Sequence, residues 1–420
     1  MLPQPSMATR RVEYELESSP LIEHADTGRR FERIRSIDVA RGAVMVLMAL
    51  DHVRVYAGVP AGGPTPALFF TRWITNFCAP AFFFLAGTGA YLYARQIENR
   101  PALARWLLVR GLWLVLLELT VIRFAWTFNF DYAHYVLGGV IWSLGWCMVL
   151  MSALVFLPLP AIGGIGVAII ALHNAVVLLL AQGDPRIAAG EAPWLWRVLY
   201  FGGPLSAEAP LILLYSIIPW IGVMAAGYAF GAVMRMDPRR RDRICIALGL
   251  GAIAAFLVLR GTDLYGDPRP WSRIPAGPGG GAVAPSWIRF LNTAKYPASL
   301  SFLLMTLGPM VLVLPFLERM RGRFATALAV FGRVPLFFYL LHIPLIHLVA
   351  VLLSWARQDG GIGWLIGNHP VAVDSPPDGY RWGLGRLYLV WLLVVVALYG
   401  PCRWFAVLRS RRAGSLLRYL

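Results

Sequence analysis

Long apolar stretches recur along the chain and restrict its fold more than any other feature. A helix that crosses a bilayer needs about 20 mainly apolar residues, and about ten stretches of this sequence meet that requirement. Only 14% of the 420 residues are charged, against about 25% in a soluble domain. We therefore expect an all-α polytopic membrane protein with about ten transmembrane helices, which excludes a soluble enzyme. The expected spans are 37–57, 72–94, 103–124, 135–157, 161–182, 211–234, 243–260, 297–317, 325–353 and 384–408.

Arginine placement predicts how these spans are oriented. Positively charged residues gather in the cytoplasmic connections of membrane proteins. Here short, arginine-rich connections alternate with longer ones rich in Gly, Pro and Trp, so the first set should face the cytoplasm. An even number of spans then places both termini in the cytoplasm. The arginines of the first set are Arg29, Arg30, Arg33, Arg35, Arg95, Arg100, Arg105, Arg235, Arg239, Arg240, Arg241, Arg243, Arg319, Arg321, Arg323, Arg409, Arg411 and Arg412.

The same topology divides the chain into three parts and accounts for its net charge of +16. We expect a polar cytoplasmic tail at 1–36, a transmembrane domain at 37–408 and a basic cytoplasmic tail at 409–420. The first tail lacks the apolar core of a signal peptide, and we expect a multi-pass protein of the inner cell membrane. Because the basic residues lie between spans, they indicate topology and not a nucleic-acid partner. Lys295 is the only lysine, a bias from which alone no chemistry follows.

The sequence lacks the familiar motifs of nucleophilic and metal catalysis. It contains no GxSxG, HExxH or Walker sequence. General acid–base chemistry by histidine remains, since its ordinary pKa of about 6.5 suits proton abstraction at neutral pH. No disulfide framework or metal site is expected, because no CxxC pair is formed by Cys78, Cys147, Cys245 and Cys402.

Several expected spans carry polar groups at one common depth. At a rise of about 1.5 Å per residue, His52 lies roughly 22 Å from the cytoplasmic start of its span, in a hydrocarbon core of about 30 Å. Glu118 comes out at about the same height and His342 at roughly 25 Å. Asn76 is about one turn inside the second span, which enters from outside. Because ionisable residues within spans mark functional sites, we take this layer in the outer leaflet as the candidate site.

The first span joins this layer to the cytoplasmic surface. One stripe of the expected helix carries Asp38, Arg41, Met45, Met48 and His52. Arg41 and His52 are roughly 16 Å apart along the axis, which is of the order of an extended pantetheine arm. Asp51 is turned about 100° away from His52 and is not expected to orient its imidazole directly.

Structural roles compete with catalytic ones in this layer. An intramembrane histidine can serve as a hydrogen-bonding group between helices, and this alternative stays open for His52 and His342. Glu118 must face protein and not lipid. An ion pair with Arg110 or Arg123 would account for Glu118 without catalysis.

Three blocks of sequence point to a known family. They are Arg35–Gly42 with Met48, Asp51 and His52, then Arg72–Pro80 with Phe84–Gly87, and finally Gly332–His342. In this order they resemble the transmembrane acyltransferase superfamily, and in particular its bacterial branch related to heparan-α-glucosaminide N-acetyltransferase. The number of expected helices also fits.

The resemblance implies a reaction and a donor. An acetyl or another short acyl group would pass from cytoplasmic acetyl-CoA, or another acyl-CoA, to an acceptor on the far side of the bilayer. In the lysosomal relative the acceptor is a glucosamine amine, and in a related family it is often a hydroxyl of an envelope glycan. Residues 37–408 would then be a transmembrane acyltransferase domain.

The resemblance also implies roles for the residues of the layer. His52 would act as the general base, and Asn76 would hydrogen-bond the developing oxyanion. The full set expected to be catalytic is His52, Asp51, Asn76 and His342. The set expected to bind coenzyme A is Arg35, Asp38, Arg41 and Tyr339.

One departure concerns His52 itself. The lysosomal branch carries Asn at the matching position, and its catalytic His aligns about three helical turns later, where this chain has Gly62 and Gly63. The assignment of His52 therefore comes from the wider superfamily.

Two other classes of function stay open at this point. A proton-coupled transporter of small solutes would use Asp51, His52 and Glu118 as a relay, and a non-catalytic envelope assembly protein would not need His52 at all. The acceptor, the acyl chain length, the choice between direct transfer and an acyl-His intermediate, and a homo-oligomeric state are also open.

Overall fold

The computed structural model describes residues 34–59, 65–97, 99–206, 210–272, 284–358, 360–367 and 376–411. Gly62, Gly63 and most of both expected tails lie outside these residues. The longer helices are α2 (Arg35–Tyr56), α3 (Pro66–Trp73), α4 (Cys78–Ile97), α5 (Arg100–Leu117), α7 (Val140–Leu154), α8 (Leu159–Gly183), α11 (Ile218–Phe230), α12 (Pro238–Thr262), α14 (Leu300–Arg319), α15 (Arg323–Arg333), α16 (Pro335–Arg357) and α18 (Leu384–Arg411). The shorter ones are η1 (Ile74–Phe77), η2 (Glu118–Ile122), α6 (Arg123–Thr127), α9 (Pro185–Ala188), α10 (Trp194–Trp196), η3 (Arg197–Phe201), η4 (Val233–Arg235), α13 (Ser286–Leu291) and α17 (Gly361–Ile366).

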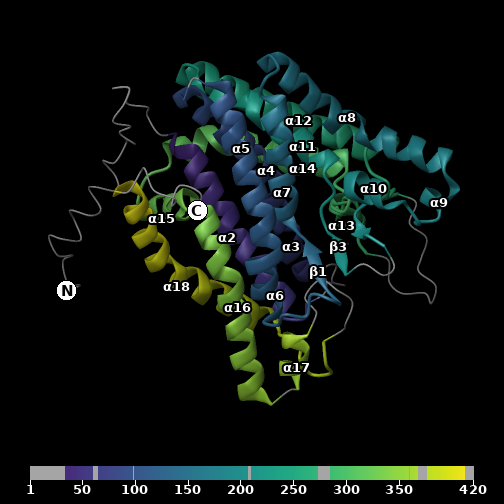
Figure 1. The fold of residues 1–420 in the computed structure, drawn as a ribbon, viewed down its shortest axis with the longest axis vertical. Helices are drawn as coiled ribbons and strands as arrows, with labels where there is room; N and C mark the ends of the chain where they lie inside the picture. Colours follow the sequence, from purple (N-terminus) through teal and green to yellow (C-terminus); the bar gives the residue numbers. More distant parts are fainter. Residues whose placement is uncertain are drawn as a thin grey trace.

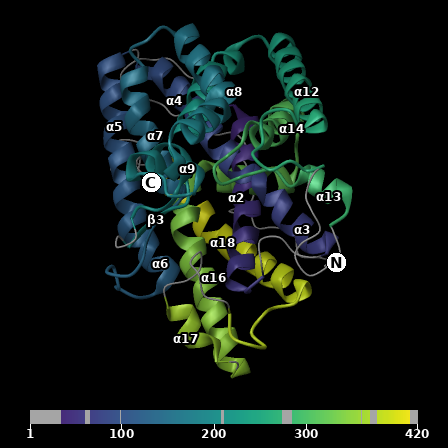
Figure 2. The ribbon, with the colours of Figure 1, turned by 90° about the vertical axis from the view of Figure 1, so that its right-hand side faces the viewer.

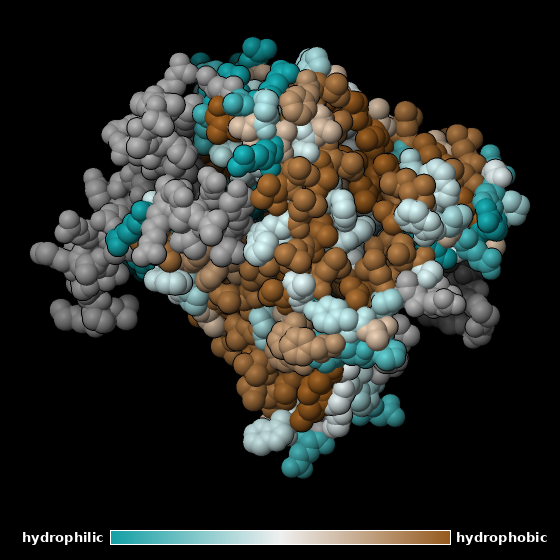
Figure 3. Space-filling model, in the orientation of Figure 1, coloured by the Kyte–Doolittle hydropathy of each residue, from teal (hydrophilic) through white to brown (hydrophobic). Residues whose placement is uncertain are grey.

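The helical membrane fold expected from the sequence is present. Within the described ranges, seven helical segments are long and apolar enough to cross a membrane: Pro66–Ile97, α8, Ile218–Arg235 (α11 continued through η4), α12, α14, α16 and α18. Figure 3 shows a broad apolar surface over the middle of the molecule, with hydrophilic residues above and below it. α2 and α5 carry more charged residues and α7 is shorter, so the number of about ten spans and their orientation remain predictions.

Helix α2 lies in the interior of the molecule and positions the candidate site. It packs against α4, α14, α15, α16 and α18, and Figures 1 and 2 show it surrounded by these helices. Its contact with α15 is close because Gly42 faces the backbone of Leu328 and Gly332 faces the backbone of Asp38, each with no room for a Cβ atom.

Two expected spans begin with strands and not with helix. β1 (Val136–Gly138) pairs in parallel with β3 (Leu211–Leu213), and β3 pairs antiparallel with β2 (Gly203–Pro204). The expected spans 135–157 and 211–234 were therefore too long at their starts. A short apolar run does not reveal by periodicity whether it is strand or buried helix.

The expected span 325–353 is also wrong, because it is two helices. α15 ends at Arg333, and α16 starts at Pro335 after Val334, whose φ of −130° and ψ of 51° are not helical. Pro335 has no N–H to continue a helix and disfavours a helical conformation at the residue before it. The depth of His342 was counted along one continuous helix, so that count is not valid. The contacts of His342 show instead which residues lie at its level.

Candidate active site

His52 and His342 meet between two helices in the interior. Nδ1 of His52, near the end of α2, is 2.7 Å from Nε2 of His342 in α16. The two rings are nearly parallel, with centroids 4.9 Å apart and an angle of 18° between planes. His342 is fully buried, whereas His52 is partly exposed. The sequence-based expectation that these two side chains share one level therefore agrees with the structure.

The hydrogen bonds of His342 define which nitrogen of each ring carries the proton. Nδ1 of His342 lies 2.8 Å from the carbonyl oxygen of Tyr339 and 3.0 Å from that of Phe338. Carbonyl oxygens only accept, so Nδ1 of a neutral His342 is the donor and its Nε2 is an acceptor. Nδ1–H of His52 then donates to this Nε2. The remaining nitrogen of His52, Nε2, keeps a lone pair and can accept a proton.

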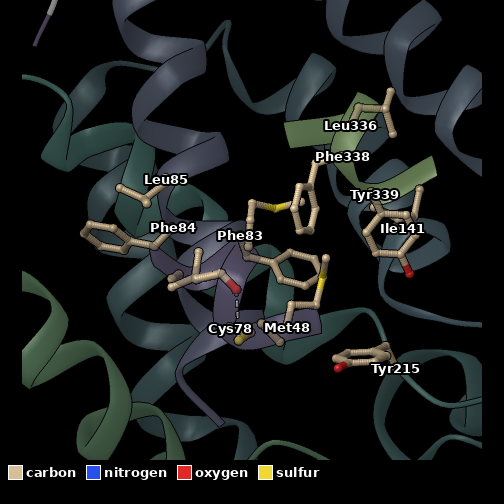
Figure 4. Close-up of a cluster of buried hydrophobic side chains, with 14 of the residues drawn as sticks. Met48, Cys78, Phe83, Phe84, Leu85, Ile141, Tyr215, Leu336, Phe338 and Tyr339 are labelled. Carbon is tan, nitrogen blue, oxygen red and sulfur yellow. Dashed lines mark hydrogen bonds between the residues drawn. The ribbon is translucent and has the colours of Figure 1, made fainter. Parts of the chain in front are cut away.

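Aromatic side chains form the walls around His52. The ring of Trp126 lies edge-on at 4.8 Å from that of His52, and the ring of Tyr339 at 6.2 Å. The hydroxyl of Tyr56 donates to the carbonyl oxygen of Trp126 over 2.7 Å, which ties α6 to α2. Figure 4 shows Tyr339 and Tyr215 in the same buried cluster. The pair is thus enclosed mainly by apolar surface, where electrostatic interactions are stronger than in water.

Asp51 is engaged away from the histidine pair. Its carboxylate accepts from Nε of Arg54 over 2.9 Å. The same guanidinium donates to the carbonyl oxygen of Val59 over 2.7 Å and so anchors the end of α2. The structure agrees with the expectation that Asp51 does not orient His52 directly, and its catalytic role stays a prediction.

Asn76 and Glu118 are both buried, and in each side chain one oxygen has no hydrogen-bond partner among the described residues. Oδ1 of Asn76, in η1, has no hydrogen-bond partner among the described residues. Glu118, in a π-helical turn, lies with its carboxylate against the backbone of Gly139 and Ile141 at the start of α7. Its Oε2 has no partner within the described part of the chain. π-Helical turns frequently occur at functional sites.

The alternative of an ion pair for Glu118 is wrong. In the residues that the structure describes, no salt bridge joins Glu118 to Arg110 or Arg123. Arg123 instead donates to Thr127, Asn129 and the carbonyl oxygens of the loop that follows α6.

Three of the four residues expected to bind coenzyme A, Arg35, Asp38 and Arg41, lie in the first half of α2, at the end away from His52. The fourth, Tyr339, is in α16. Arg41 donates to the carbonyl oxygen of Leu85 over 2.7 Å and keeps a partly exposed side chain. Asp38 is buried and lies 3.9 Å from Nε of Arg333. Nε of Arg35 is buried without a hydrogen-bond partner in the described chain. Their role toward coenzyme A is not tested by these contacts.

Sequence reasoning missed part of the layer. Lys295, in the segment before α14, is close enough to Asp51 and His52 for their charges to interact. The hydroxyls of Tyr215 and Tyr296 are 3.3 Å apart on the same side. Lys295 had a signal in the sequence, as the only lysine in an arginine-rich chain. The tyrosines had none, because tyrosine is also common at membrane interfaces.

Together these features define a class of protein. A helical membrane fold that buries a histidine pair with a free basic nitrogen is suited to proton-transfer chemistry within the membrane. The family described as heparan-alpha-glucosaminide N-acetyltransferase, catalytic, matches residues 33–263. This match covers more than half of the chain, and the chain belongs to that family. It is an acetyl-CoA-dependent membrane acetyltransferase.

The family match covers only one of the two histidines of the pair. It contains α2 and His52 but ends before α16, so His342 lies outside the matched residues. No curated protein matches the chain. Membership of an enzyme family favours the acyltransferase over the transporter and over the non-catalytic assembly protein.

Proposed function

We propose that the protein transfers an acetyl or other short acyl group from cytoplasmic acyl-CoA to an amine or hydroxyl of an extracytoplasmic glycan or other envelope acceptor. His52 is the general base. The observation that carries this proposal is the 2.7 Å hydrogen bond between Nδ1 of His52 and Nε2 of His342. It leaves Nε2 of His52 as the unprotonated nitrogen of a partly exposed residue.

In the proposed reaction the acceptor gives its proton to Nε2 of His52 as its nitrogen or oxygen attacks the thioester carbonyl carbon. Collapse of the tetrahedral intermediate breaks the carbon–sulfur bond, and the leaving thiolate takes the proton from His52. While His52 is positively charged, its Nδ1–H stays bonded to His342, which holds the ring in place and disperses the charge.

The remaining residues bind and orient in this proposal. The amide of Asn76 donates to the oxyanion of the intermediate. Arg35 and Arg41 meet the phosphates of coenzyme A near the cytoplasmic end of α2, with Asp38 beside them. The pantetheine arm then follows α2 over roughly 16 Å to His52, and Tyr339 lines its end.

A transfer assay tests the role of His52. Purified wild type and His52→Ala are incubated with labelled acetyl-CoA and a panel of amino sugars. Loss of a general base lowers the rate by roughly 10²- to 10⁴-fold. His134→Ala is the matched control, because His134 lies outside the layer with its side chain 77% exposed. Equal label transfer by wild type and His52→Ala would remove His52 from the mechanism.

A further inference from the structure

The backbone on both sides of Lys295 is held in place by a buried carboxylate, that of Asp267. Its side chain is only 6% exposed. One carboxylate oxygen of Asp267 accepts from the backbone N–H of Ala294 and from the hydroxyl of Ser299, both over 2.9 Å. The other lies 3.7 Å from NH1 of the buried Arg260. The backbone on both sides of Lys295 is therefore fixed, which limits where its ammonium group can go.

Among the residues that the structure describes, the ammonium group of Lys295 has no ionic partner of its own. No hydrogen bond or salt bridge joins it to another side chain within the described ranges, and it lies 5.3 Å from the ring centroid of Tyr296. The ammonium nitrogen is not one of the fully enclosed polar atoms that lack a partner in the described residues, so this buried lysine keeps its charged end accessible. A buried lysine with a fixed backbone, an accessible ammonium group and no ion-pair partner in the described residues, next to a histidine with a basic nitrogen, is an arrangement expected of a ligand site and not of a packing contact.

The surrounding charges also leave a positive surplus. Arg54, Lys295 and Arg72 are all near enough to Asp51 for their charges to act on it, so one carboxylate lies within the electrostatic reach of three positive side chains. Arg54 alone already pairs with Asp51 at 2.9 Å. The other carboxylate of the layer, Glu118, lies against the start of α7 and close enough to Tyr339 for the two to interact.

The excess positive charge near Asp51 is too far from the expected position of the phosphates of coenzyme A to bind them. In the proposed function those phosphates lie near Arg41, roughly 16 Å along α2 from His52. The excess positive charge near Asp51 is therefore available to the other substrate.

We propose that Lys295 determines acceptor specificity by pairing with an acidic group, a carboxylate or a phosphate, on the sugar that receives the acetyl group. This inference rests on the proposed function and narrows it to acidic acceptors. The acidic group sits beside Lys295, and the acceptor's amine or hydroxyl faces Nε2 of His52. The ion pair forms away from bulk water, where it discriminates more strongly than at an exposed surface.

The test compares three acceptors and three forms of the protein. The acceptors are glucosamine, which has no acidic group, glucosamine 6-phosphate and muramic acid, which carries a carboxylate. Wild type should show a lower KM for at least one acidic sugar than for glucosamine. Lys295→Met should raise the KM for that acidic sugar roughly 10- to 100-fold relative to the KM for glucosamine, whereas any change in kcat that comes from the altered charge near His52 should be the same for all three sugars. Lys295→Arg should restore most of the preference.

Arg186→Gln is the control for a general loss of positive charge, because Arg186 is 67% exposed in a segment outside the layer. Equal efficiency of wild type with all three sugars would overturn the inference without any variant. So would a Lys295→Met variant that changes kcat/KM for all three sugars by the same factor, since Lys295 would then not distinguish acidic acceptors from glucosamine. Absence of transfer to every sugar would overturn the proposed function together with this inference.

Discussion

At the scale of single residues, the site depends on two histidines that lie 290 positions apart in sequence. Each has a distinct place in the hydrogen-bond chain. His342 is fixed by two carbonyl oxygens of its own helix, and His52 is fixed by His342. A residue that acts only through another should have a smaller effect than the residue it positions.

This difference gives a prediction for His342. His342→Ala should lower kcat roughly 10- to 100-fold, less than His52→Ala, because the base is still present but no longer oriented. His342→Gln should recover part of the loss, since its side-chain oxygen can accept the Nδ1–H of His52. Steady-state kinetics of the labelled transfer measure both.

The double variant His52→Ala/His342→Ala supplies the control for this prediction. If the two residues act as one unit, it should be no slower than His52→Ala alone. Losses that multiply would show independent roles and contradict the proposed pair.

At the scale of elements, the close contact between α2 and α15 holds the first half of α2 in place. Gly332→Ala should lower the stability by about 1–3 kcal/mol, because its Cβ would meet the carbonyl of Asp38 and push the two helices apart. Thermal unfolding of the purified protein in detergent measures the change.

Gly251 in α12 provides the matched control for this substitution. A Cβ atom there would meet nothing within 4 Å, and Gly251→Ala should be neutral or slightly stabilising. A melting temperature of Gly332→Ala at or above that of wild type would contradict the close packing.

The helices themselves were largely predictable from sequence, but their interruptions were not. Apolar length alone located α8, α12, α14 and α18, because about 20 apolar residues have few alternatives to a membrane helix. The break at Val334 was missed although Pro335 offered a signal. The strands β1 and β3 were missed because their few residues lie inside longer apolar runs.

The site was predictable to a similar degree. Rise per residue predicted one layer for His52, His342 and Glu118, since depth along a helix is a local property, and the structure brings His52 and His342 of this set into contact. Which side chains touch depends on how helices rotate and pack against each other, and the sequence does not contain this directly. The pairing of His52 with His342, the engagement of Asp51 by Arg54 and the approach of Lys295 therefore emerged only from the structure.

At the scale of the whole molecule, the fold encloses the reactive pair among helices and presents an apolar face outward. Large apolar side chains such as Val167, Leu179 and Val258 are exposed, as expected for a surface in contact with lipid. The α2 helix runs from the arginines at its start to His52 near its end. One helix thus links the proposed donor entrance to the proposed reaction centre.

The most direct test of this arrangement is an electron cryo-microscopy structure of the protein with acetyl-CoA bound. We expect the coenzyme phosphates beside Arg35 and Arg41, and the thioester carbonyl within about 3–4 Å of the place an acceptor atom would occupy next to Nε2 of His52. Density that places the thioester on another face of the molecule, or away from the His52–His342 pair, would contradict the account.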